Sequence, residues 1–319
     1  MGVIDIKLPH VDAVVQDVIT EEQAQFFLEN GFLVIRNVIR GEELSLAQAE
    51  MQKLVDQGMA EELDHPDFMY GVGVKSGQPI LRRVEYVIEK SDPMKVLLGH
   101  PFILRTVEKL QGVNFIPTWD SMVLKAPNEG VIVPWHRDAA VPEGCTDPRP
   151  IFNVDFYLDE ADLQTCLWVI PGTNRWSAEE ADNRIKQPGF STDDAIPVPM
   201  QPGDVILHNI EVLHGSPAGD GNPLRRTVYY EFRPGEIEAE FGPHTLEYLA
   251  LKQHMLYDCI ERRKQAAYTQ GETPFEYKPQ GGFAIHEAKK PEQYRYAHGD
   301  YWRRKVEFVQ RQGRSKDRN

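Results

Sequence analysis

The sequence predicts a mainly β protein with flanking helices, in which the strands form an antiparallel barrel or sandwich. Two observations support this fold class. Residues 115–232 hold short β-prone runs, such as IFNVDFYL and RRTVYYEF, separated by Pro-Gly turn signals with no helix between them. Both flanks place apolar residues at helical spacing. We therefore expect one domain over residues 1–319, with helices at 18–112, a β core at about 115–233 and a helical extension at 245–319.

The flanking elements can be placed by their local signals. Thr20 and Gln23 have the spacing of a capping box, and Gly31 is expected to end the helix that they begin. The run GFLVIRNVI that follows predicts a short strand, and further helices are expected in GEELSLAQAEMQKLVDQGM, in DPMKVLLGHPFILRTVEKLQG and at residues 245–268. Between them, residues 68–88 look like a hairpin inserted into the helical flank.

Composition excludes several classes of protein. The formal charge of −14 argues against nucleic-acid binding, and no apolar run is long enough to cross a bilayer. The N-terminus lacks the pattern of a secretory signal, and the three cysteines are widely spaced, so we expect a cytoplasmic protein with reduced thiols. Residues 301–319 carry seven basic and two acidic residues, which indicates either a solvated tail or a segment that closes over an anionic ligand.

The chain contains three His-x-Asp triplets, and their context separates them. In a strand, residues i and i+2 project from one face, so a His-x-Asp pair there can bind one metal ion. His65 and Asp67 lie in the helical flank with a proline between them, and the triplet at 298–300 follows every β-run. Only His136 and Asp138 lie among the strands, with further strands after them.

A metal site needs a third ligand, for which the run GDVILHNIEVLHGS offers two histidines. His208 falls inside a strand, where packing or hydrogen bonding within the sheet is expected. His214 comes at a strand end, where a side chain can face both metal and substrate, so we favour His214. Two imidazoles and one carboxylate leave three positions open, an arrangement that suits non-haem Fe(II), although zinc would accept the same ligands.

Two cations are candidates for binding an organic acid at this site. Arg225 follows His214 by eleven residues, and its planar guanidinium suits the far carboxylate of an α-keto acid that chelates the metal. Lys125 precedes His136 by eleven residues and is available to the same acid. Arg226 is expected to face the other side of its strand. Taken alone, Arg225 or Lys125 is more often a surface charge, and their value as candidates lies in their joint placement around the triad.

In order along residues 18–233, the motifs ITEEQAQFFLENGFLVIRNVI, WHRD, LWVIPGTNRWS and GDVILHNIEVLHGSPAGDGNPLRRTVYYEF resemble the phytanoyl-CoA dioxygenase-like family of Fe(II)- and 2-oxoglutarate-dependent oxygenases, which includes ectoine hydroxylase. The resemblance implies a double-stranded β-helix, a cupin-like jelly roll. It implies Fe(II), 2-oxoglutarate and O2 as cofactor and cosubstrates, and oxidation of a C–H bond with release of succinate and CO2.

The same resemblance assigns site residues. It implies His136, Asp138 and His214 as iron ligands and Arg225 as the residue that binds the distal carboxylate of 2-oxoglutarate, with Lys125 and Ser216 assisting. Related halogenases carry a small residue at the carboxylate position, so Asp138 implies hydroxylation or a kindred oxidation of a small-molecule substrate.

Substrate contacts are expected from alternation along the strands. In IFNVDFYL, Asn153, Asp155 and Tyr157 share a polar face that looks either into the barrel or toward solvent. Trp119 shares a strand face with Lys125 and is either a substrate wall or a core residue. Loops often carry binding residues, so the 68–88 insert, with Tyr70 and Tyr86, is a candidate lid.

The substrate and two other classes of function stay open. The acidic net charge argues against an anionic thioester substrate, yet Arg82 and Arg83 form a local basic pair. A redox-inactive cupin-type metal enzyme, such as an isomerase or hydrolase, would use the same ligands with Arg225 incidental. A non-catalytic β-sandwich binding module would leave the triad a coincidence.

Overall fold

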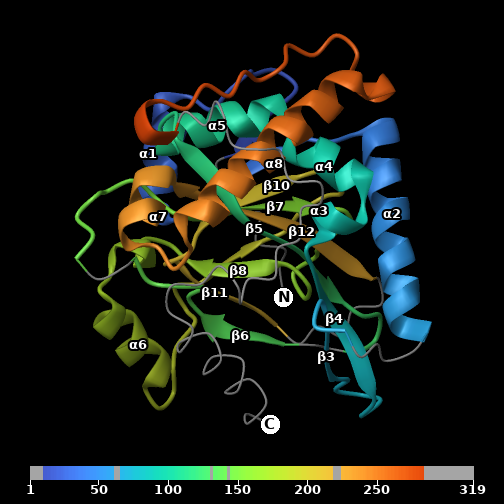
Figure 1. Cartoon of the computed structure of the whole chain (residues 1–319). Coiled ribbons are helices and arrows are strands. Elements are labelled where there is room, and N and C mark those ends of the chain that lie inside the picture. Colours follow the sequence, from blue (N-terminus) through green and yellow to red (C-terminus); the bar gives the residue numbers. More distant parts are fainter. Residues whose placement is uncertain (1–9, 61–64, 130–131, 142–143, 218–223, 284–319) are drawn as a thin grey trace.

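A computed structural model describes residues 10–60, 65–129, 132–141, 144–217 and 224–283 of the chain. Two β-sheets face each other, and most of the helices lie against the outer face of the larger sheet (Figure 1). The space between the sheets holds the candidate functional residues described below.

The strands of the large sheet are, in their spatial order, β1 (His10–Asp12), β2 (Phe32–Arg36), β10 (Val205–Asn209), β7 (Phe152–Tyr157), β12 (Arg225–Pro234), β5 (Phe115–Lys125), β4 (Pro79–Glu85) and β3 (Phe68–Val72). Apart from the parallel pair of β1 and β2, neighbouring strands run antiparallel. The small sheet contains β6 (Val133–His136), β11 (Leu213–Ser216), β8 (Leu167–Ile170) and β9 (Ile196–Val198). From β5 to β12, successive strands change sheet at every step except between β8 and β9, which is the jelly-roll arrangement predicted for the chain.

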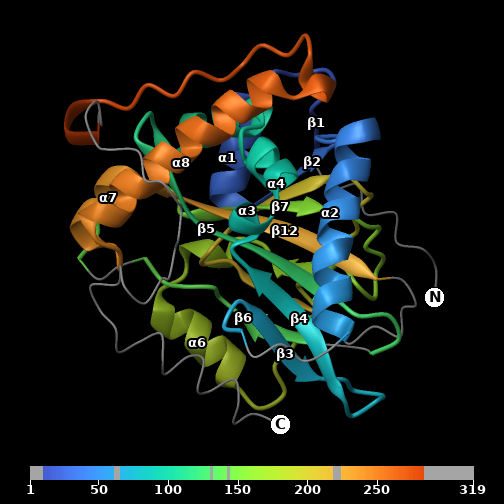
Figure 2. The same cartoon turned by 45° about the vertical axis from the view of Figure 1, so that its right-hand side comes forward.

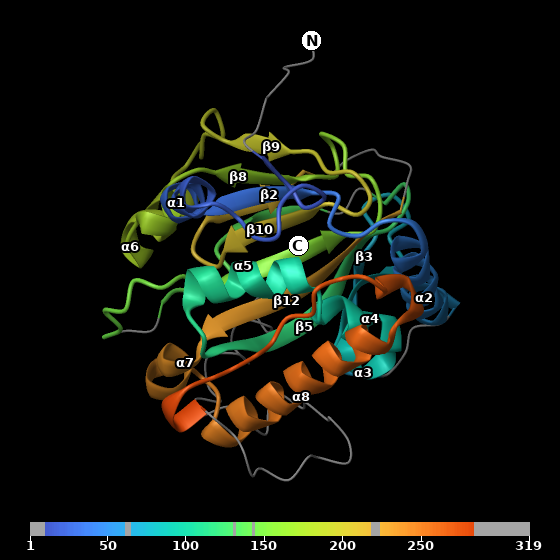
Figure 3. The same cartoon turned by 90° about the horizontal axis from the view of Figure 1, so that it is seen from above.

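The helices of the described chain are α1 (Glu21–Asn30), α2 (Gly41–Ala60), α3 (Val87–Lys90), α4 (Asp92–Leu98), α5 (Pro101–Gln111), α6 (Ala178–Lys186), α7 (Gly235–Phe241) and α8 (Leu246–Gln265). Seen from above, α4, α5 and α8 lie across β5 and β12 (Figure 3). Helix α2 covers the far end of the sheet beside β4 (Figure 2). These helices leave the inner face of the large sheet free to form the site.

The main core lies between the large sheet and these helices. It takes one face of each central strand, as alternation requires: on β7, Phe152, Val154 and Phe156 are fully buried in this core. Burying such aromatic and branched side chains removes much apolar surface from water and provides the main driving force for folding. The opposite, polar face of the same strand is therefore directed at the small sheet.

Several local predictions are confirmed. Thr20 and Gln23 form the reciprocal capping box of α1, and Gly31 ends that helix with φ of 80°, a left-handed conformation that favours glycine. Residues 68–85 form the antiparallel hairpin β3–β4, which pairs with β5 and so extends the large sheet. The three cysteines are free thiols.

One expectation about the β region is wrong, because a helix interrupts it. Helix α6 lies between β8 and β9 and begins with a full capping box formed by Ser177 and Glu180. The spacing of these two residues was a readable signal that the strand pattern obscured. Within the described residues, no helix combines the length and apolar character needed to span a bilayer.

Candidate active site

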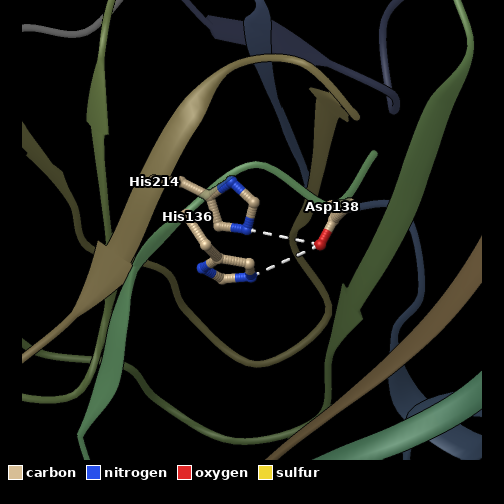
Figure 4. Close-up of side chains that lie close together, drawn as sticks. All are labelled: His136, Asp138 and His214. Carbon is tan, nitrogen blue, oxygen red and sulfur yellow. Dashed lines mark ion pairs between the residues drawn. The ribbon is translucent and has the colours of Figure 1, made fainter. Parts of the chain in front are cut away.

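Three potential metal ligands meet at the mouth of the small sheet. His136 ends β6, Asp138 follows it, and His214 lies on β11 directly opposite His136. The Nε2 atoms of His136 and His214 lie 3.4 and 3.7 Å from Oδ1 of Asp138. All three side chains point into one space (Figure 4). The candidate ligand atoms lie within 4.8 Å of one another, so a single ion could contact all three.

Backbone contacts orient the two imidazoles. Nδ1 of His136 lies 2.7 Å from the carbonyl of Pro134, and Nδ1 of His214 lies 3.0 Å from the carbonyl of Val212. A carbonyl oxygen only accepts hydrogen bonds, so each Nδ1 carries the proton and each Nε2 is left with a lone pair. The backbone N–H of Asp138 donates to the carbonyl of Ile210 (2.9 Å), which fixes the third ligand.

His208, the alternative ligand, contacts Asp138 instead. Its Nε2 lies 2.9 Å from Oδ2 of Asp138, and its Nδ1 lies 2.6 Å from Oδ2 of Asp155. Asn153 also donates from Nδ2 to Oδ2 of Asp138 (2.9 Å). Both ring nitrogens of His208 face carboxylates and have no lone pair for a metal ion. Oδ2 of Asp138 is thus held by hydrogen bonds, while Oδ1 faces the two other imidazoles.

The electrostatics of the cluster favour metal binding. Burial, and then His136, lower the pKa of His214 to about 3, so this imidazole is neutral at physiological pH. Burial would raise the pKa of Asp138, but the three surrounding imidazoles outweigh it and hold that pKa well below its usual range. Burial would lower the pKa of His136, but Asp138 raises it overall. A metal ion therefore competes with a proton mainly at His136.

His208 and Asp155, which lie behind the metal ligands, form a charged pair. Burial would lower the pKa of His208, but the carboxylates of Asp155 and Asp138 outweigh it and raise that pKa to about 10. The imidazolium form supplies an N–H to each of the two carboxylates. His208 is only 1% exposed, so water does not screen these contacts.

A second cationic position lies on the large sheet. Arg225 and Lys125 are direct neighbours across β12 and β5. Arg225 is 3% exposed, its Nε has no hydrogen-bond partner, and its Nη1 donates to the hydroxyl of Thr227 (2.8 Å). Among the described residues, no carboxylate forms an ion pair with this guanidinium. A buried guanidinium without a counter-ion is costly, so the position suits an anionic ligand. Arg226 faces the other way and pairs with Asp159 (2.8 Å), as expected.

Lys125 lies beside the guanidinium of Arg225, and burial and that charge both lower the pKa of Lys125. Its Nζ donates to the carbonyl of Pro217 (2.6 Å). Burial, and then Arg225, lower the pKa of Lys125 to about 7. Ser216, the other assisting residue, donates its hydroxyl to the carbonyl of Cys166 (2.7 Å) and also lines the space between the sheets.

One cavity of about 470 Å³ joins the metal ligands to the cationic position. Its walls include the candidates Trp119, Asn153, Tyr157 and Tyr70, together with Lys125 and Ser216. The polar face of β7 thus looks inward, not toward solvent. Trp119 lies on the wall and donates from Nε1 to Oε2 of Glu85 (2.6 Å). The Tyr70 hydroxyl donates to the carbonyl of Gly58 (2.8 Å).

Three expectations require correction. Asp155 does not line the cavity, because it lies behind His208 and is 1% exposed. Tyr86 packs in the main core, and the 68–88 segment forms a wall of the sheet, not a separate lid. His65 and Asp67, expected in the helical flank, instead directly precede strand β3, and Asp67 pairs with Lys90 (2.6 Å). The triplet at 298–300 and the basic segment 301–319 lie outside the described residues.

Sequence reasoning missed several residues of the cavity wall. Tyr229 and Glu231 line it because they share the face of β12 that carries Arg225, and the two-residue period from Arg225 would have found them. Arg233 and His244 lie deeper along the same wall, where Arg233 pairs with Glu231 (2.7 Å). Arg82 and Arg83, singled out only as a basic pair, both face the cavity.

Comparison with known proteins shows the family to which the chain belongs. Residues 27–227 match the family described as Phytanoyl-CoA dioxygenase (PhyH). The dioxygenase LolE1 of Epichloe uncinata is 23% identical over 236 residues, which cover 72% of this chain and 90% of that protein. The peroxisomal phytanoyl-CoA dioxygenase of Rattus norvegicus is 23% identical over 288 residues, which cover 82% of this chain and 80% of that protein.

Solved structures show the same fold. The structure of EctD from S. alaskensis with 2-oxoglutarate and 5-hydroxyectoine superposes with a TM-score of 0.56 at 20% identity, covering 67% of this chain and 76% of that one. The matched segment contains the metal-ligand cluster and Arg225. The chain belongs to the phytanoyl-CoA dioxygenase family of Fe(II)- and 2-oxoglutarate-dependent oxygenases.

Proposed function

We propose that this enzyme hydroxylates an unactivated C–H bond of a small-molecule substrate, with Fe(II) held by His136, Asp138 and His214 and with 2-oxoglutarate held by Arg225. One observation carries the proposal: a convergent His-Asp-His cluster and a buried guanidinium without an ion-pair partner among the described residues line the same cavity. The family and the fold agree with it.

The donor set fits ferrous iron. Two neutral imidazoles and one carboxylate make a facial triad that leaves three positions for other ligands. The hydrogen bonds from His208 and Asn153 to Oδ2 leave Oδ1 of Asp138 as the ligand atom. Partners of this kind fix ligand orientation and tune the metal.

The cationic position fits 2-oxoglutarate. The dianion has two carboxylates separated by a short chain, so one can bind the metal while the other reaches Arg225. The fork of Arg225 offers two parallel N–H groups, and Lys125 adds a point charge beside it. Ser216 lies on the same wall, but its hydroxyl is held by Cys166, so we assign it a supporting role.

Iron and 2-oxoglutarate, when bound, would supply the oxidation chemistry with O2, of which one oxygen atom goes into succinate as CO2 is released and the other is inserted into a C–H bond. The residues of the chain bind and orient the metal, the cosubstrate and the substrate, and they exclude water. Asp138 leaves no space for a halide ligand, which favours hydroxylation. Trp119, Tyr157 and Tyr70 line the same cavity as the metal ligands, and the substrate is proposed to lie between them.

The proposal is tested by incubating the purified chain with Fe(II), 2-oxoglutarate and O2 and by measuring succinate without added substrate. We expect slow succinate formation that a chelator abolishes and that Asp138→Ala eliminates. Asp147→Ala is the matched control, because Asp147 pairs with Arg149 (2.6 Å) and is not part of the His-Asp-His cluster. Binding of Fe(II) without any turnover of 2-oxoglutarate would instead indicate a redox-inactive metal enzyme. A cytoplasmic location stays a prediction of the sequence.

A further inference from the structure

We propose that the substrate carries an anionic group, a carboxylate or a phosphate, which Arg82 binds at the end of the cavity formed by the β3–β4 hairpin. This inference rests on the proposed function, because it concerns the substrate of the same site. It names a substrate class and a specificity-determining residue.

A β-bulge turns Arg82 toward the cavity. On β3, Met69 and Tyr70 are consecutive, but their Cα partners on β4 are Arg83 and Leu81. Arg82 is the extra residue of this bulge. Leu81 faces the main core and is 0% exposed, so strict alternation would direct Arg82 away from it and Arg83 back toward it. The bulge lets both arginines line the cavity instead, and bulges often redirect side chains beside active sites.

Every other cation on the cavity wall has an assigned partner. Arg83 pairs with Glu85 (2.7 Å) and lies over the ring of Trp119 at 5.3 Å. Arg233 pairs with Glu231 and with Glu238, at 2.7 and 3.1 Å. Arg225 and Lys125 are assigned to 2-oxoglutarate in the proposed function. These assignments leave only Arg82 among the cavity-lining arginines and lysines.

Arg82 carries a positive charge that no carboxylate of the described residues pairs with. Within the described ranges, it forms no ion pair, and burial lowers the pKa of its guanidinium without an acidic group to oppose the shift. A half-buried charge of this kind is unfavourable until a ligand supplies the counter-ion. The cost is tolerable in a binding site, where the charge selects the ligand.

The hairpin leaves room for the Arg82 side chain across β3. Gly71 lies beneath it on β3, and a Cβ added at Gly71 would lie 2.1 Å from Cδ of Arg82. Glycine at this position lets the stem of Arg82 lie flat across β3. A side chain at Gly71 would displace Arg82 from this position, so the glycine is needed for the placement.

The surrounding walls describe the rest of the ligand. Near Arg82 the cavity is lined by Met69, Tyr70 and Trp119, which suit an apolar or planar body. The whole cavity of about 470 Å³ must also hold the metal and 2-oxoglutarate, so the substrate is a small molecule. We expect its anionic end at Arg82 and its oxidised carbon near the His-Asp-His cluster.

The test uses benzoate, phenyl phosphate and benzamide as probes. Each is titrated by calorimetry into the full chain loaded with Fe(II) and saturating 2-oxoglutarate, without O2. We expect at least one anion to bind about tenfold or more tightly than neutral benzamide. A preference for benzoate identifies a carboxylate site, and a preference for phenyl phosphate identifies a phosphate site.

Variants assign the preference to a residue. Arg82→Gln should remove it while benzamide affinity stays unchanged, which shows that the cavity is intact, and Arg82→Lys should keep part of it. Lys75→Gln removes one charge from the exposed turn of the same hairpin and should leave the preference unaltered. If Arg82→Gln does not fold, Arg82→Met is used in its place, because methionine keeps the aliphatic stem without the charge.

Several outcomes would overturn the inference. These are equal affinity for benzoate and benzamide, an anion preference that persists in Arg82→Gln, and a preference lost in Arg225→Gln alone, which would place the anion at the 2-oxoglutarate position. The proposed function is judged separately, by succinate formation. A chain without turnover could still bind anions at Arg82, and an active oxygenase could show no such binding.

Discussion

Nε2 of His208 lies 2.9 Å from Oδ2 of Asp138, and the same ring reaches the buried carboxylate of Asp155 through Nδ1 at 2.6 Å. The imidazolium between two carboxylates holds one oxygen of Asp138 and directs the other toward His136 and His214. His208 is thus a positioning residue, which acts on the metal site through Asp138.

Replacing His208 should weaken metal binding before it affects folding. For His208→Asn we expect Fe(II) to bind about 10- to 100-fold more weakly, because the carboxylate loses the partner that orients it. The measurement is anaerobic Fe(II) titration beside thermal unfolding. Activity lost at low Fe(II) should therefore be largely recovered when kcat is measured at saturating Fe(II). A variant with unchanged Fe(II) affinity would show that Asp138 needs no support from His208.

Arg225 and Arg226 are adjacent but serve different ends. Arg225→Gln should raise the KM for 2-oxoglutarate by about tenfold or more, because the distal carboxylate loses a charged, forked partner. Arg226→Gln breaks the contact with Asp159 and should lower the melting temperature while leaving that KM unchanged. Equal effects of the two variants on KM would contradict the assignment.

Lys125 predicts a pH dependence of cosubstrate binding. Burial and Arg225 lower the pKa of Lys125 to about 7 in the free protein, so the ammonium is lost as pH rises above that value. A bound dianion favours the ammonium, so binding above pH 7 takes up a proton and the Kd for 2-oxoglutarate rises with pH. Calorimetry at several pH values, at saturating metal, measures both quantities.

The control for this prediction is Lys125→Arg, which keeps its charge over the whole range. Its Kd should vary less with pH than that of the native chain. An identical pH profile in the two proteins would assign the dependence to another group, such as His136.

Lys252 on α8 and Asp120 on β5 form a buried pair with Nζ and Oδ1 3.7 Å apart. Lys252→Met leaves a buried carboxylate without its cation and should cost about 3–5 kcal/mol in the free energy of unfolding. Adding Asp120→Asn should recover part of that loss. Urea unfolding measures the values, and Lys264→Met, on the exposed side of α8, should change them by less than about 0.5 kcal/mol.

Much of the fold and of the ligand cluster could be predicted because the signals are local. The two-residue spacing of His136 and Asp138 predicts that they meet, and they do, although β6 ends at His136 and Asp138 lies just beyond it. Thr20 with Gln23 marks a helix start. The contact of His208 with Asp138 depends on β10 pairing with β7, where His208 lies opposite Asn153. That register joins residues 55 positions apart and is not written in either segment.

The bulge at Arg82 was hidden for a similar reason. Alternation within β4 alone places Arg82 and Arg83 on opposite faces, and only the pairing with β3 shows the extra residue. Helix α6 is a different case, because its capping box was readable but the surrounding strand pattern dominated the interpretation. Long-range pairing, not local propensity, set the limit of the prediction.

The edge position of the β3–β4 hairpin makes it exchangeable. It joins the rest of the sheet through only three paired positions, Arg83, Val84 and Glu85 against Val123, Met122 and Ser121. Neither the metal ligands nor Arg225 lies on it. Hairpins that keep the core residues Phe68, Leu81 and Val84 but differ on the cavity side should therefore redirect the enzyme to new molecules while its oxidation chemistry continues, which makes this edge a starting point for engineering.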